Sequence, residues 1–319
     1  MAPSNSNSLG TRAFNVFRGG LIGVVEVVPG VSGGTVALII GAYETLINAA
    51  GHITSAVRLA ISDLPRGRGG ARAKEELRRA DWPMVLPMMI GMVCALALGA
   101  KLVAPLVENH QQYAFALFFG LVLASLYIPY THSGQRWKPL NYLVAAAMGL
   151  GAFFLTGLTP AEVTANPLTV FFGGSIAICA LVLPGLSGSF LLLTMGLYQP
   201  VIDAANDRDL ALLGSFALGC ALGLGLFVKV LKWVLEHHHH IAIVVMTGLM
   251  AGSMRALWPW QDDDRNMYAP GDGAPATFTL MAFGFALVVT VIVAERRIRQ
   301  AKERRAALPE RGRRKHARV

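Results

Sequence analysis

The residues best suited to hold a charged ligand lie in two interruptions of otherwise apolar sequence. The first follows Glu26 and reads PGVSGGT over residues 29–35, and the second reads PGLSGS over residues 184–189. Proline and glycine break a helix, and the half-helix that begins after the break exposes N–H groups without intrahelical partners. Together with nearby hydroxyls, such groups favour an anion. The sequence therefore predicts an anion site built from these interruptions.

The candidate ligand-binding residues are the polar and flexible positions of both interruptions and one later arginine. They are Glu26, Pro29, Gly30, Ser32, Gly33, Gly34, Thr35, Pro184, Gly185, Ser187, Gly188, Ser189 and Arg255. An ionised carboxylate is costly in a membrane and is usually functional there. Glu26 is therefore expected to bind and release a proton or to form an ion pair. The guanidinium of Arg255 is suited to bidentate contact with a phosphate, and interfacial solvation is the alternative.

Close packing of small residues between membrane helices is the alternative explanation for the interruptions. Their duplication favours a ligand site instead. Aligned on their prolines, the two stretches share the Pro-Gly-x-Ser-Gly sequence and three later positions. These are Gly41/Gly196, Tyr43/Tyr198 and Ile47/Ile202, whereas Leu181 stands where the first copy has Glu26.

Composition places these segments in a membrane. The chain has 319 residues, of which 54% are hydrophobic and 15% charged, and its mean hydropathy is +0.50. Soluble domains are about 25% charged. Apolar runs close to the roughly 20 residues that cross a bilayer are expected to form ordinary spans. They lie near residues 83–107, 113–130, 139–157, 209–229, 240–257 and 276–295.

The predicted fold is an all-α polytopic membrane protein of two inverted repeats. Each repeat is a broken or re-entrant helical hairpin followed by three spans, and three crossings invert the second copy. Residues 1–13 form an N-terminal tail. Repeat 1 covers 14–157, with hairpin 14–48 and a basic loop at 51–82, and repeat 2 covers 168–295, with hairpin 168–202. Two short full crossings per hairpin remain an alternative. Paired breaks in inverted halves indicate a substrate site near the midplane.

The distribution of charge predicts the orientation. Most of the 28 Lys and Arg residues fall on one side of this topology, mainly in the 51–82 loop and the basic tail 296–319. Because basic loops stay in the cytoplasm, both termini are expected there. The net charge of +9 then faces anionic lipid, so a nucleic-acid partner is not expected. The three cysteines have no metal-ligand spacing, and neither a metal nor a cofactor is expected.

Three motifs in order resemble the polyprenyl-phosphate transporter family. They are Glu26-x-x-Pro-Gly-Val-Ser-Gly-Gly-Thr35, the segment 184–189 with its later Gly-x-Tyr198, and Gly252-Ser-x-Arg255-x-x-Trp-Pro-Trp260. The resemblance implies a transporter and not an enzyme. It implies that undecaprenyl phosphate returns from the outer to the inner leaflet of the bacterial cytoplasmic membrane, for reuse in cell-envelope and peptidoglycan synthesis. Alternating access around a midplane phosphate site is the implied mechanism.

Two other functions compete with this interpretation. Undecaprenyl pyrophosphate phosphatases also use a Pro-Gly-x-Ser element, but theirs continues with arginine where this chain has Gly33 or Gly188. A carrier or channel for a small soluble anion is the second, because half-helix N–H groups bind sulfate or carboxylate as readily as phosphate. Besides polyprenyl phosphate and membrane lipids, protons and a second copy of the chain are candidate partners.

Overall fold

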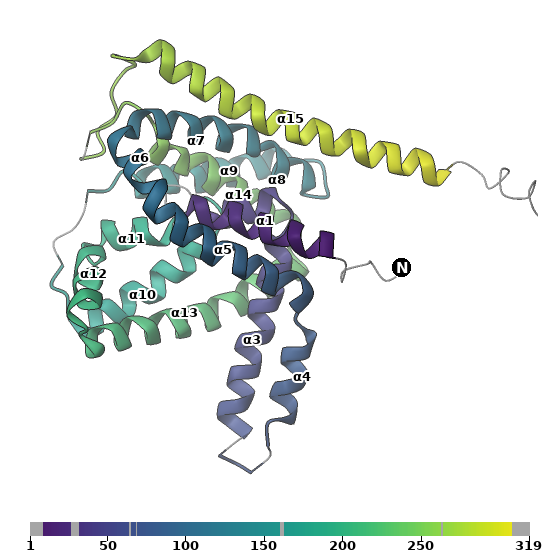
Figure 1. Ribbon diagram of the computed structural model, residues 1–319, viewed down its shortest axis with the longest axis vertical. Helices are drawn as coiled ribbons and strands as arrows, with labels where there is room; N and C mark the ends of the chain where they lie inside the picture. Colours follow the sequence, from purple (N-terminus) through teal and green to yellow (C-terminus); the bar gives the residue numbers. More distant parts are fainter. Residues whose placement is uncertain are drawn as a thin grey trace, which may run out of the picture.

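A computed structural model describes residues 9–26, 32–63, 65–67, 69–159, 163–262 and 264–307, and most of this chain is helical (Figure 1). The segments long and apolar enough to cross a membrane are Trp82–Gly99, Gln111–Thr131, Leu210–His237, His239–Leu257 and Ala274–Ala294. The protein is therefore an all-α, multi-pass membrane protein, as predicted. The remaining expected span, 139–157, corresponds to a shorter apolar helix of 17 residues.

The helices follow the order of the predicted segments in both halves. The first half contains α1 (Leu9–Val25), α2 (Gly33–Ile39), α3 (Tyr43–Asp63), α4 (Ala71–Arg79), α5 (Trp82–Leu102), α6 (Ala104–Asn109), α7 (Gln111–Ser125), α8 (Tyr127–His132) and α9 (Pro139–Leu155). The second contains α10 (Pro167–Val182), α11 (Gly188–Thr194), α12 (Tyr198–Asp207), α13 (Leu210–His237), α14 (His239–Ser253), the 3₁₀ helix η1 (Met254–Leu257) and α15 (Ala274–Ala307).

The first helix of each half packs on the first long span of the same half, through a glycine. In α5, Gly91 lies so close to the backbone of Val16 in α1 that a Cβ would overlap it. In α13, Gly219 lies equally close to the backbone of Phe171 in α10. Both glycines are the tenth residue of their helix. Small residues allow this close approach of membrane helices.

The last helices of the two halves are exchanged. Helix α7 packs on α15, where Gly120 lies against the backbone of Met281. Helix α14 packs on α9, where Gly248 lies against the backbone of Ala145. Each half thus places its final helix against the other half, and corresponding helices make corresponding contacts. That the halves cross the membrane in opposite directions stays a prediction.

The helices that follow the breaks in the two predicted hairpins are short. Helices α2 and α11 have only seven residues each, and α2 meets α3 at a bend of 119°. Seven residues rise about 10 Å, far less than the roughly 30 Å of a bilayer core. This length argues against two full crossings, so we retain the re-entrant form as the proposal.

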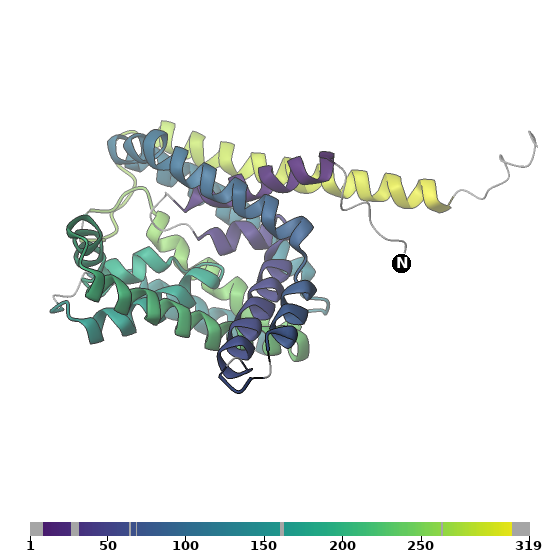
Figure 2. The same ribbon diagram turned by 60° about the horizontal axis from the view of Figure 1, so that its bottom comes forward.

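The basic segment 51–82 is not an extended loop. Its residues continue α3 and form α4, and the two helices project together from the bundle (Figures 1 and 2). The tail predicted from residue 296 likewise begins as helix, because α15 extends to Ala307 beyond the neighbouring helices (Figure 2). Alanine, lysine, arginine and glutamate are strong helix formers, which explains why charge did not end these helices.

Candidate functional site

The two interruptions fold into the same local structure. Ser32 precedes α2 with φ −104° and ψ 127°, and Ser187 precedes α11 with φ −102° and ψ 127°. Each short helix is followed by a glycine in the left-handed region, Gly41 at φ 66° and Gly196 at φ 69°. Only glycine adopts this conformation without strain, so these two glycines end the half-helices. The sequence repeat is therefore also a repeat of backbone conformation.

The two interruptions contact each other across the boundary between the halves. The Ser32 hydroxyl donates to the carbonyl of Leu183 at 3.3 Å, and the Gly185 N–H donates to Thr35 Oγ1 at 2.8 Å. Ser32 and Thr35 are only 3% and 2% exposed. Nearby, the Tyr43 hydroxyl donates to the Val182 carbonyl at 3.1 Å. The structure thus brings together, in one buried polar region, residues separated by about 150 positions.

The side chain of Glu26, which follows α1, reaches the start of the first half-helix, α2. Its Oε1 atom accepts the Gly33 N–H at 2.9 Å. A Cβ on Gly33 would overlap this oxygen, which gives the glycine a direct role in admitting the carboxylate. The expectation of an open N–H group at the start of α2 is therefore wrong for Gly33, because the carboxyl group of Glu26 already accepts this N–H.

Among the described residues, no carboxylate accepts an N–H group of the second half-helix. Its serine acts as the N-cap, since Ser187 Oγ accepts the Phe190 N–H at 3.4 Å and lies 3.0 Å from the exposed Ser189 hydroxyl. Gly188 packs on α10, where a Cβ would meet the Ala177 carbonyl. Close packing is thus part of the reason for glycine here, as the alternative explanation held.

The remaining predicted residues of the interruptions divide into three groups. Gly34 lies against the backbone of Val182 in the other half, which places it at the boundary. Pro184 and Gly185 are buried, and Gly185 has φ 92° and lies against the backbone of Met250 in α14. Pro29 and Gly30 lie outside the described residues.

Arg255 lies apart from the direct contacts of the interruptions, in η1. Its Nη1 donates to the Phe153 carbonyl at 3.2 Å and its Nη2 donates to the Arg265 carbonyl at 3.4 Å. Arg265, which sequence reasoning missed, places its guanidinium 3.9 Å from the ring centre of Phe190 in α11. The connection from Arg255 to the second interruption therefore runs through Arg265. No sequence pattern predicts the unusual backbone angle of Arg265, φ 63°.

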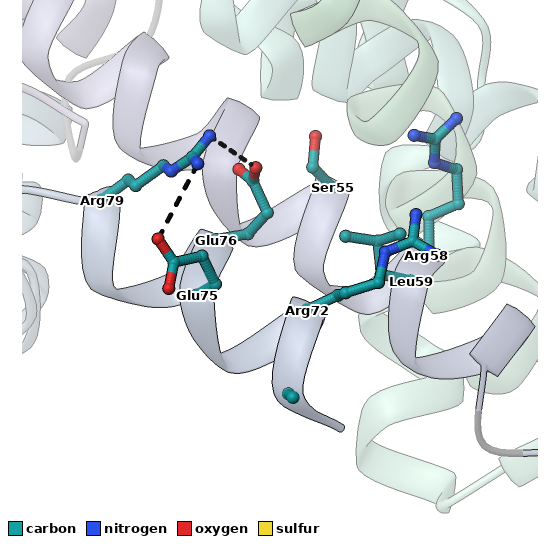
Figure 3. Close-up of a pocket in the computed structure, with 8 residues that line it drawn as sticks. Ser55, Arg58, Leu59, Arg72, Glu75, Glu76 and Arg79 are labelled. Atoms are coloured by element: carbon teal, nitrogen blue, oxygen red, sulfur yellow. Dashed lines mark hydrogen bonds and ion pairs between the residues drawn. The ribbon is translucent and has the colours of Figure 1, made fainter. Parts of the chain in front are cut away.

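A charged cavity of about 560 Å³ lies elsewhere, between α3 and α4 (Figure 3). Arg79 in this cavity contacts Glu76 at 3.1 Å and Glu75 at 3.8 Å, so its charge is already paired. None of the predicted site residues that the structure describes lines it. The cavity belongs to the projecting helices and not to the boundary between the halves.

A helical membrane protein with paired, contacting breaks between two related halves has the architecture of a secondary transporter. A family model described as undecaprenyl phosphate translocase-like matches residues 22–272, and the chain belongs to this family. A polyprenyl-phosphate transporter of Vibrio cholerae is 34% identical over 263 residues, which cover 82% of this chain and 81% of the relative.

A second relative comes from Staphylococcus aureus and is also named a polyprenyl-phosphate transporter. It is 26% identical over 268 residues, covering 77% of this chain and 86% of the relative. No solved structure matches the chain. The family description and both names agree with the prediction of a transporter and not an enzyme.

Proposed function

We propose that the protein moves polyprenyl phosphate, in bacteria undecaprenyl phosphate, from the outer to the inner leaflet of the cytoplasmic membrane. This returns the carrier lipid for cell-envelope synthesis. Support comes from the family and from relatives that are named for this lipid. The basic loops favour cytoplasmic termini. The isoprenoid chain is soluble in the bilayer, so the main task of the protein is to shelter the phosphate.

The observation that carries the proposal is the direct contact of the two interruptions. Ser32 and Gly185 donate to groups of the opposite half, and Gly33 donates to Glu26. A phosphate monoester has three strong acceptor oxygens and can take over such donors. Each donor that turns to the phosphate releases a bond that now joins the halves or holds Glu26. Binding of the headgroup thereby loosens the boundary, and rocking of one half against the other exposes the site to the second leaflet.

Glu26 has a defined part in this proposal. Its carboxylate satisfies the Gly33 N–H while no phosphate is bound, and it must leave when the headgroup arrives, because two anions repel at close range. Protonation is one way for the carboxylate to leave, and it would couple transport to protons. The seven-residue half-helices have small dipoles, so the hydroxyls and N–H groups of the interruptions bear most of the phosphate contact.

The competing functions predict different chemistry. A phosphatase needs a nucleophile or acid beside the phosphate, but the described hydrogen bonds of Ser32 and Ser187 join them to a carbonyl, an N–H group and another hydroxyl. A carrier for a soluble anion needs no lipid chain. Release of inorganic phosphate and uptake of sulfate or phosphate therefore separate these functions from lipid transport.

The test measures leaflet exchange and binding of labelled undecaprenyl phosphate in proteoliposomes. Removing a hydroxyl that donates to a charged group should weaken binding about tenfold to a hundredfold. We expect this loss in Ser32→Ala and Ser187→Ala. Ser125→Ala is the matched control, because the Ser125 hydroxyl donates within α7 to Leu121. Normal binding by both variants would show that the interruptions do not bind the phosphate. Stoichiometric release of inorganic phosphate would identify the protein as an enzyme.

A further inference from the structure

Two arginines outside the interruptions converge on the end of one helix. Arg255 donates to the carbonyl of Phe153, and Arg265 Nη1 donates to the carbonyl of Thr156 at 3.5 Å. Both carbonyls belong to the C-terminal end of α9. A helix end carries about half a negative charge, and capping it favours one cation. Two full positive charges exceed what this end balances.

The described chain supplies no carboxylate to neutralise the pair. The ion pairs of the described residues include neither Arg255 nor Arg265. Asp262, near in sequence, accepts instead from Asn266 and from the Tyr268 hydroxyl at 2.7 Å, and residue 263 lies outside the described part. The Nε of Arg255 is buried without a hydrogen-bond partner among described groups. Burial, and next the charge of Arg255, lower the pKa of Arg265.

The fold holds the pair in place despite this repulsion. A short hairpin, closed by the bridge between Gln261 and Met267, fixes Arg265 with φ 63°. The guanidinium of Arg255 lies 4.7 Å from the ring centre of Phe153, and that of Arg265 stacks on Phe190. Stacked guanidinium groups keep their edges available for hydrogen bonds. At position 157, a Cβ would overlap the Arg255 guanidinium, so glycine makes room for it.

An apolar groove begins at Phe153, the residue whose ring contacts Arg255. It has a volume of about 380 Å³ and lies between α9 and α14, where alanines and glycines leave a shallow channel. Phe153 lines its end, and the same ring stacks under Arg255. Among the described lining residues Thr247 has the one polar side chain, and its hydroxyl donates to the Ile243 carbonyl of its own helix. Neither arginine lines the groove, but Phe153 joins the two, because it lines the groove and contacts the Arg255 guanidinium.

We propose that Arg255 and Arg265 bind the phosphate of a phosphomonoester lipid whose isoprenoid chain lies in the groove between α9 and α14. This rests on the proposed function and adds a substrate subsite distinct from the interruptions. Two guanidinium groups match the charge of a monoester, about −1.5 to −2 at neutral pH, better than the single charge of a diester phospholipid. The pair thereby selects the carrier lipid from the bulk lipids of the membrane.

The phosphate half of the subsite is tested by binding to the full-length protein in detergent. The probes are inorganic phosphate, farnesyl phosphate and the diester phosphatidylglycerol. Arg265→Gln should weaken binding of both phosphates about tenfold or more and leave phosphatidylglycerol unchanged. The matched control is Arg208→Gln, because Arg208 is an exposed arginine with a similar backbone angle, φ 57°, away from the pair.

The chain half of the subsite is tested by filling the groove. Ala146 lines the groove and Ala147, the next residue of α9, does not. Ala146→Leu should weaken the binding of farnesyl phosphate and leave the binding of inorganic phosphate unchanged, whereas Ala147→Leu should change neither. If Ala146→Leu loses the binding of both ligands, the proposed groove occupant is overturned. Equal weakening of farnesyl phosphate by Ala146→Leu and Ala147→Leu would do the same.

Three further outcomes separate the two proposals. Unchanged phosphate binding in Arg265→Gln overturns the subsite, and so does equal weakening of phosphatidylglycerol, which indicates a role in capping α9. In the double variant Arg265→Gln with Asp263→Asn, restored phosphate binding would show that the Asp263 carboxylate neutralises Arg255. That result would also overturn the subsite. If the unaltered protein binds farnesyl phosphate here but leaves polyprenyl phosphate in its leaflet, the subsite stands and the proposed transport fails.

Discussion

Replacing Glu26 tests how the first interruption exchanges its own anion for the substrate. Oε1 of Glu26 lies 2.9 Å from the Gly33 nitrogen, so a phosphate that binds there as proposed has to displace it. Glutamine keeps an oxygen that accepts this N–H but removes the charge. A hydrogen bond to a charged group contributes about 1.5–3 kcal/mol and a neutral one about 0.5–1.5 kcal/mol. Glu26→Gln therefore weakens the competitor by roughly 1–1.5 kcal/mol.

The expected result has two parts with opposite signs. Phosphate should bind the variant about fivefold to tenfold more tightly, because displacement is easier and one repulsive charge is gone. Transport should become slower and should lose its dependence on pH, because no carboxylate returns to expel the phosphate. The assays are equilibrium binding of undecaprenyl phosphate and its leaflet exchange between pH 6 and 9.

The matched control is Glu44→Gln. Glu44 belongs to the same half but is exposed and contacts His239 at 3.0 Å, away from the Gly33 nitrogen. Its replacement should leave binding and leaflet exchange unchanged. Unaltered binding and transport by Glu26→Gln across the pH range, in a protein that still inserts and folds, would refute the reasoning and leave Glu26 with a packing role.

Three other predictions concern topology, packing and the hairpin that holds Arg265. In a protein without its native cysteines, a cysteine at position 67 should label from the cytoplasm and one at position 271 from outside; labelling of both from one side contradicts the inverted halves. Gly91→Ala should lower the melting temperature because its Cβ meets the Val16 backbone, whereas Gly151→Ala, with open space around it, should stabilise the protein by up to about 1 kcal/mol. Asp262 belongs to the hairpin that holds Arg265, and hydrogen bonds, first from the Tyr268 hydroxyl, lower the pKa of its carboxyl group. The stabilising effect of these bonds is present at neutral pH and is lost as pH falls through the lowered pKa. Asp262→Asn should loosen the hairpin and weaken farnesyl phosphate binding already at neutral pH.

Much of the fold was accessible from the sequence because its signals are local. Apolar runs indicate spans wherever they occur, and Pro-Gly breaks a helix in any context. The shared conformation of Ser32 and Ser187 follows from a shared local sequence. Helix α4 was missed because a charged segment was interpreted as a loop, although its residues are good helix formers.

The site was less accessible because its contacts join distant residues. Glu26 reaches a half-helix that begins seven residues later, and only the path of the chain decides that its carboxylate turns back to Gly33. The closeness of Arg265 to Phe190 depends on the hairpin at 261–267 and on the position of α11. Neither contact follows from spacing along a helix. The exchange of α9 and α15 between the halves is likewise a property of the whole fold.

The difference between the two interruptions bears on how transport is gated. Their backbones are alike, but the first carries Glu26 and the second carries Leu181 with Arg265 nearby through Phe190. In the proposed cycle, a phosphate at the arginine pair is attracted by two cations, whereas a phosphate at Gly33 must displace the carboxyl group of Glu26. Movement between these positions is therefore uphill in electrostatic terms until Glu26 leaves or is neutralised. This asymmetry makes Glu26 the gate of the proposed cycle, since it blocks one position while the arginines hold the headgroup at the other.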